Sequence, residues 1–89
     1  MTSITDERQK KTIHRLHRLQ GQLIALERRV EEGATVEETV VQARAIEKGV
    51  ASLIVYVVDS FVEQSRNTMV HDPEQAVRDI QRLIELIHQ

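Results

Sequence analysis

The segment that most constrains this chain runs from Val50 to Val58, nine consecutive residues without a charged side chain. It lies in a stretch from Thr35 to about Arg66 that contains no proline, which predicts a helix that is apolar on every side. A membrane span needs about 20 apolar residues, so this run is too short to cross a bilayer. Two neighbouring helices cannot cover it in a chain of 89 residues. We therefore expect the protein to associate with other copies of itself.

The remaining periodic segments predict two more amphipathic helices. The first begins near Thr5 and ends near Gly33, a residue that favours helix C-termini. The central helix begins at a capping box formed by Thr35 and Glu38. The last begins with Asp72 as N-cap and proline in its first turn. The apolar stripes of the first and last helices comprise Ile13, Leu16, Leu19, Leu23, Leu26 and Val30, and Ala76, Val77, Ile80, Leu83, Ile84 and Ile87.

No strand pattern, internal repeat or low-complexity segment interrupts these helices. We predict linkers at 32–34 and 67–71, and a single all-helical domain over residues 1–89. Gly21, inside the first helix, marks either a close approach by another group or a tolerated accident. The fold class expected from the pattern is all-α, with three helices in each protomer.

Several classes of function are disfavoured by what the sequence lacks. There is no cysteine, which removes disulfides, thiolate metal sites and thiol nucleophiles. The opening residues contain no apolar signal-peptide core, so we expect a cytoplasmic protein. No glycine-rich phosphate loop or catalytic constellation is present, and the carboxylates suit a solvated helix face. We therefore expect neither an enzyme nor a protein with a bound cofactor.

Positive charge is concentrated at the start of the chain although the whole is slightly acidic. With 12 basic and 14 acidic residues the net charge is −2, which excludes a bulk polycation. Through Gln20, however, five basic residues face two acidic ones. Four of them, spaced by 3, 4 and 3 residues, form the basic stripe Arg8, Lys11, Arg15 and Arg18. Such a stripe can follow DNA phosphates, or it is the ordinary polar face of a helix; charge alone does not separate the two.

Two histidines lie within the same region. His14 and His17 are three residues apart and could share a metal ion. No carboxylate or cysteine ligand lies near them in sequence, and the surrounding cations repel a metal ion. A structural or phosphate-facing role is therefore favoured.

The ordered motifs resemble those of a known family. RLHRLQGQL at 15–23, ALER at 25–28, VQARAI at 41–46 and VASL at 50–53 together resemble the CsoR/RcnR family, the copper-, nickel- and formaldehyde-responsive repressors. The resemblance implies that the first two helices pair with a second copy as an antiparallel four-helix bundle. Two such dimers would form a flat tetramer that binds operator DNA. It also implies DNA contacts by Arg15 and Arg18, while Glu47 replaces a basic residue that the family carries in the second helix.

The residues at the family's sensing positions differ completely. The family binds its inducer through a cysteine near the start of the second helix and through residues 25 and 29 positions later, which are usually His and then Cys or His. The corresponding residues here are Val36, Phe61 and Ser65. Valine and phenylalanine offer no lone pair, and a hydroxyl is a poor ligand for soft metals. We expect either a dry contact between the side chains at these positions, with no ligand bound, or a pocket for a small uncharged effector.

The sequence thus predicts a DNA-binding transcriptional repressor that acts as a homo-tetramer, or failing that a dimer, without the metal or thiol sensor. The partner is double-stranded operator DNA. The residues expected to face it are Arg8, Lys11, His14, Arg15, Arg18, Arg44 and Lys48. The alternative is a helical interaction module that has lost DNA binding and pairs with a related repressor. The net charge and Glu47 favour this alternative, whereas the basic stripe opposes it.

Overall fold

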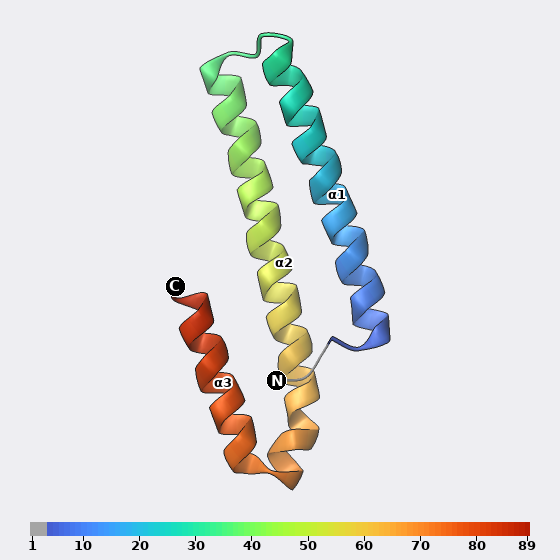
Figure 1. Cartoon of the computed structure of the whole chain (residues 1–89), viewed down its shortest axis with the longest axis vertical. Coiled ribbons are helices and arrows are strands. Elements are labelled where there is room, and N and C mark those ends of the chain that lie inside the picture. Colours follow the sequence, from blue (N-terminus) through green and yellow to red (C-terminus); the bar gives the residue numbers. More distant parts are fainter. Residues whose placement is uncertain (1–3) are drawn as a thin grey trace.

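The chain forms three helices joined by two short turns (Figure 1). The computed structural model describes residues 4–89. The first three residues lie outside the described residues; they belong to the stretch that we expect to lack an export signal. The helices are α1 (Asp6–Glu31), α2 (Val36–His71) and α3 (Pro73–Ile87). Residues 4–89 contain no strand, so the predicted all-α class with three helices is confirmed.

The ends of the helices follow the local signals in the sequence. Gly33 has φ +92°, in the region that favours glycine, and ends α1. At the start of α2, the Glu38 N–H donates to Thr35 Oγ1 at 3.1 Å, and the Thr35 N–H donates to Glu38 Oε2 at 3.3 Å. Asp72 caps α3 by accepting from the Gln75 N–H at 3.2 Å, with Pro73 in the first turn. The predicted capping box and the predicted proline start are therefore confirmed.

The predicted linker at 67–71 is wrong. Residues 67–71 are helical, and α2 ends only at His71. The break falls at Asp72, whose backbone has φ −150° and ψ 79°. A residue that precedes proline is driven out of the helical region by the proline ring, and nothing before Asp72 interrupts the helix in this way. The turn is consequently a single residue, and α3 returns directly along α2.

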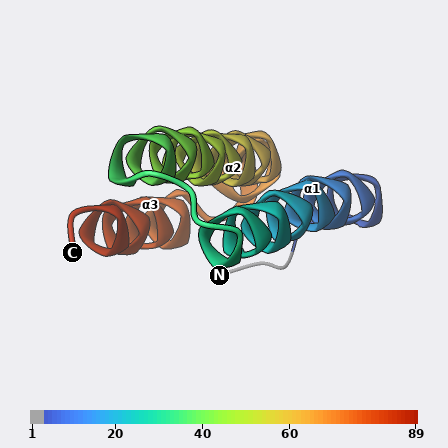
Figure 2. The ribbon, with the colours of Figure 1, turned by 90° about the horizontal axis from the view of Figure 1, so that it is seen from above.

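α2 lies between the other two helices (Figure 1) and α1 and α3 pack on the same side of it (Figure 2). α1 runs along α2 for most of its length, whereas the shorter α3 covers only the C-terminal half. Within residues 4–89, α1 and α3 do not contact each other. The Cα atoms span 57 × 27 × 12 Å, so the protomer is a flat slab rather than a closed bundle.

This slab buries little apolar surface. Only four apolar side chains among residues 4–89 are buried: Leu19, Ile46, Phe61 and Ala76. Within the central uncharged run, α1 and α3 leave Val55 68% exposed, and Ile54 is exposed as well. On α1, four of the six residues of the predicted stripe are also exposed, including Leu16 and Leu23. Two neighbouring helices therefore do not cover α2, as the sequence predicts, and both long helices present an unpartnered apolar face. In residues 4–89 no helix is long and apolar enough to span a membrane.

We expect the protein to be a tetramer in solution, with a dimer as the smallest stable species, because each large exposed apolar side chain that becomes buried contributes roughly 1.5–3 kcal/mol. Light scattering at micromolar concentration should give a mass several times that of the 10.3 kDa chain. Leu23→Glu should lower this mass, while Gln81→Glu, which adds the same charge at an exposed position of α3, should leave it unchanged. A monomeric wild type would contradict the prediction.

Candidate nucleic-acid interface

The residues predicted to face DNA lie on α1 and on the first half of α2, and they differ in exposure. Arg8 and Arg15 are half-buried at the contact between the two helices. The other five are exposed: Lys11, His14 and Arg18 on α1, and Arg44 and Lys48 on α2. The basic stripe is therefore divided, since two of its four members turn toward α2 and two face solvent.

Both half-buried arginines meet the same aromatic ring. The guanidinium carbon of Arg15 lies 4.3 Å from the centroid of the Tyr56 ring, and that of Arg8 lies 4.9 Å from it. These distances are well within the range of a cation–π interaction. The Tyr56 hydroxyl is buried and has no hydrogen-bond partner among residues 4–89. Tyr56 thus contacts both arginines through its ring.

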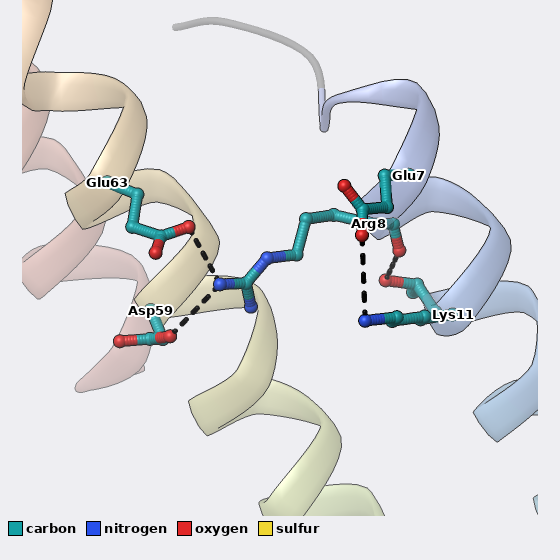
Figure 3. A network of polar contacts seen from close by, with 6 residues as sticks. Glu7, Arg8, Lys11, Asp59 and Glu63 are labelled. Atoms are coloured by element: carbon teal, nitrogen blue, oxygen red, sulfur yellow. Dashed lines mark hydrogen bonds and ion pairs between the residues drawn. The ribbon is translucent and has the colours of Figure 1, made fainter.

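Arg8 is also paired with carboxylates of α2. Its Nη2 lies 2.7 Å from Glu63 Oε2 and 3.5 Å from Asp59 Oδ2. Figure 3 shows the side chain reaching from α1 across to both acids. Partial burial alone would lower the pKa of Arg8, but the hydrogen bond to Glu63, the charge of Glu63 and the neighbouring Tyr56 together outweigh this effect and raise the pKa. Arg8 is therefore a charged group that the protein itself already neutralises.

The remaining cations fall into two groups. Lys11 lies 3.8 Å from Glu7 in a loose pair along α1, and Arg44 lies 2.8 Å from Glu47 along α2. Such exposed pairs within one helix contribute little and are easily exchanged. Arg18, Lys48 and His14 have no ion pair within residues 4–89. Among the seven residues predicted to face DNA, these three and Arg15 are the ones without an acidic partner within residues 4–89.

Arg15 and Arg18 share an open groove between α1 and α2. Its volume is about 160 Å³. It is lined by Arg15, Arg18, Leu19, Gln22, Gly49 and Ser52. Two guanidinium groups beside an amide and a hydroxyl provide donors suited to an anion such as a phosphate oxygen. The groove is therefore the part of this surface best equipped to hold a phosphate.

The floor of this groove depends on a close approach at Gly49. A Cβ atom at that position would lie only 2.7 Å from Leu19 Cδ2, so glycine lets the buried Leu19 side chain rest against the backbone of α2. At Gly21 a Cβ would meet nothing within 4 Å in the protomer. Within one protomer, therefore, no group approaches Gly21 closely. The glycine that permits a close approach between α1 and α2 is Gly49.

The three sensing positions are separated in the protomer. Val36 stands at the start of α2 and is 83% exposed. Phe61 and Ser65 are buried in the half of α2 that α3 covers, and the Ser65 hydroxyl donates to the Phe61 carbonyl at 2.9 Å. A rise of about 1.5 Å per residue puts Val36 and Phe61 about 37 Å apart along the helix. One protomer therefore cannot bring these positions together, although an antiparallel second copy could.

No cluster of three or more His, Cys, Asp or Glu side chains suited to a metal ion occurs in residues 4–89. His14 and His17 are both exposed on α1.

Sequence reasoning missed the α2 side of the interface, namely Tyr56, Asp59, Glu63, Ser52 and Gly49. The i, i+4 spacing of Asp59 and Glu63 was a usable signal, because it puts two acids on one helix face.

Comparison with known proteins identifies relatives over almost the whole chain. The family model described as metal-sensitive transcriptional repressor matches residues 8–89. A protein of Serratia marcescens, described as an uncharacterized protein in the bioA 5′ region, is 31% identical over 85 residues, which cover 96% of this chain and 93% of the relative. No solved structure matches the chain.

The contrast between the two glycines yields a stability test. Gly21→Ala should raise the free energy of unfolding by about 0.5–1 kcal/mol, because alanine favours a helix and the site is open. Gly49→Ala brings the same gain in propensity but forces Leu19 to move, and overpacking costs about 1–3 kcal/mol. In urea denaturation, the free energy of unfolding of Gly49→Ala should therefore be lower than that of Gly21→Ala by more than about 1 kcal/mol. Equal stabilisation by both would show that α1 and α2 are not closely packed at Gly49.

Proposed function

This chain belongs to the family of metal-sensitive transcriptional repressors, and from this premise we propose that it represses transcription in the cytoplasm by binding operator DNA as a homo-tetramer, without the family's metal or thiol sensing site. The observation that carries the proposal is the groove lined by Arg15 and Arg18 together with Gln22 and Ser52. Two guanidinium groups without acidic partners provide the charge and the donors that bind DNA phosphates.

The proposed contacts rank by how free each cation is. Arg18 and Arg15 make the principal phosphate contacts, because neither forms an ion pair within residues 4–89. Lys48 and His14 support them from exposed positions, and Lys11 joins them at the cost of its loose pair with Glu7. Arg44 must first leave Glu47, so its contribution is smaller. A tetramer repeats this set and so extends the cationic surface along the duplex.

Loss of the sensor is supported by the surroundings of its three positions. Phe61 and Ser65 are buried inside their own protomer, and the Ser65 hydroxyl is already engaged by the Phe61 carbonyl. Val36 supplies only methyl groups. Copper and nickel sensors need thiolate or imidazole donors, and none of these side chains provides one. We propose that an apolar contact between copies takes the place of the inducer site, in preference to a pocket for a small uncharged effector.

A helical interaction module that pairs with a related repressor is the second candidate. It is favoured by the ion pairs Arg8–Glu63 and Arg44–Glu47, which neutralise two of the predicted DNA-facing cations within the protein. The exposed apolar faces of α1 and α2 suit such pairing equally well. Binding of the purified protein to DNA separates the two candidates, because only the repressor binds DNA without a partner.

The first test measures binding to the DNA upstream of the protein's own gene over a series of salt concentrations. Arg15→Ala and Arg18→Ala should each weaken binding and lower the slope of log K against log salt by about 0.9 for every phosphate that is no longer neutralised. Arg82→Ala, at an exposed position of α3 without an ion pair within residues 4–89, is the matched control and should have no effect. Wild-type affinity in both α1 variants would refute the assignment, and a wild type that binds no DNA would favour the interaction module.

The second test concerns metals. Copper(I), nickel(II) and zinc(II) at micromolar concentration should leave DNA affinity unchanged, because the sensing positions offer no suitable donors. Combining Val36→Cys, Phe61→His and Ser65→Cys should create a metal site between copies, detectable by equilibrium dialysis. Release of DNA by stoichiometric metal from the natural protein would contradict the prediction and direct attention to His14 and His17.

A further inference from the structure

We propose that Tyr56 and its two neighbouring carboxylates determine which arginines of α1 reach DNA: the ring positions Arg15 toward the groove, while Glu63 and Asp59 withhold Arg8. Together, Arg8, Arg15, Tyr56, Asp59 and Glu63 form what we term the Tyr56 cluster. The inference rests on the proposed function, because it concerns DNA phosphates. It goes beyond that function by assigning roles to three residues of α2 that do not themselves contact phosphate.

The geometry of α1 brings both arginines to the same ring. Arg8 and Arg15 are seven residues apart, close to two full helical turns, so their side chains leave the same face of α1. Their guanidinium carbons lie 4.9 and 4.3 Å from the Tyr56 centroid. They differ in their other partners: Arg8 reaches Glu63 and Asp59, whereas Arg15 has no acidic partner in residues 4–89. Arg8 and Arg15 therefore occupy the same face of α1 but differ in whether an acid neutralises them.

For Arg15 the ring acts as a support. A guanidinium packed on an aromatic ring is held by one face, and the N–H groups at its edge remain able to donate. Because Arg15 lines the groove together with Arg18, these donors are held where a phosphate would enter. The support reduces the side-chain entropy that is lost when a phosphate binds. Tyr56 is therefore a positioning residue for Arg15.

For Arg8 the carboxylates compete with DNA. The Arg8 side chain is only 22% exposed and lies 2.7 Å from Glu63, whose own side chain is 59% exposed. An ion pair with such an exposed acid is weak, but a phosphate must displace it before it gains Arg8. In addition, the two carboxylates repel the DNA backbone. Arg8 consequently contributes little to DNA binding while Glu63 is charged, and removal of that charge should release it.

A double-mutant cycle tests the competition, with salt titrations of operator binding as the readout. Arg8→Gln should leave the slope of log K against log salt unchanged in the otherwise natural protein. Glu63→Gln should steepen it by about 0.9 for each Arg8 that gains a phosphate, with tighter binding at low salt. The Arg8→Gln, Glu63→Gln double variant should return to the natural slope. If the double variant is as steep as Glu63→Gln, the effect is a general loss of negative charge and the proposal is overturned.

Substitutions of Tyr56 test the positioning role. Tyr56→Phe keeps the ring and removes a hydroxyl that has no partner in residues 4–89, so DNA affinity should stay at the natural level. Tyr56→Leu keeps an apolar side chain but removes the ring, and affinity should fall about two- to five-fold for each Arg15 engaged. In the Arg15→Ala background the two substitutions should give equal affinities. A difference that persists there would reflect altered folding or assembly and would overturn the positioning role.

A measurement without DNA keeps the inference separate from the proposed function. Tyr56 is the single tyrosine and the chain has no tryptophan, so its emission reports on this cluster alone. Arg8→Gln and Arg15→Gln should each change that emission, while Arg82→Gln should not. Unchanged emission in both would overturn the cluster itself. If emission responds and the natural protein binds no DNA, the proposed function fails together with the role assigned to the cluster. If it binds DNA with an unaltered slope in Glu63→Gln, only the present inference fails.

Discussion

The close packing of α1 against α2 at Leu19 and Gly49 is the contact on which the functional surface depends. Because position 49 has no side chain, Leu19 rests on the backbone of α2, and the two helices remain near each other along their length. This proximity lets Arg8 and Arg15 span the gap to Tyr56. It also forms the groove that Arg15 and Arg18 share. A pair of helices held further apart would keep the same charges but would lose both arrangements.

The second physical constraint is the shortage of buried apolar surface in one protomer. α3 turns back at Asp72 and covers Phe61 and Ser65, yet it leaves Val55 and the apolar face of α1 uncovered. The same flat shape that exposes these faces makes them available for pairing with a second copy. Val36 and Phe61 lie far apart along one helix, so these two positions can meet only between protomers.

Local signals in the sequence were sufficient to predict the helices, whereas contacts between helices were not predictable. Thr35, Asp72 and Pro73 determine helix ends through groups only a few residues away, and these predictions were confirmed. The linker expected at 67–71 failed because polar residues alone do not stop a helix when the only strong breaker is Pro73. The pairing of Arg8 with Asp59 and Glu63 spans 51 and 55 residues. Helical periodicity places Arg8 on a face, but it carries no information about a partner that far along the chain.

A slightly acidic chain can bind a polyanion only if it separates its charges in space. Here the separation is local, since cations without acidic partners line the groove while Arg8 is neutralised two helical turns from Arg15. The groove of each protomer offers only two guanidinium groups, so useful affinity requires several protomers on one duplex. In the proposed tetramer the exposed apolar faces of α1 and α2 hold the copies together, which would link DNA binding to protomer concentration. Under the proposed function, assembly itself is then a physical basis on which occupancy of the operator can vary.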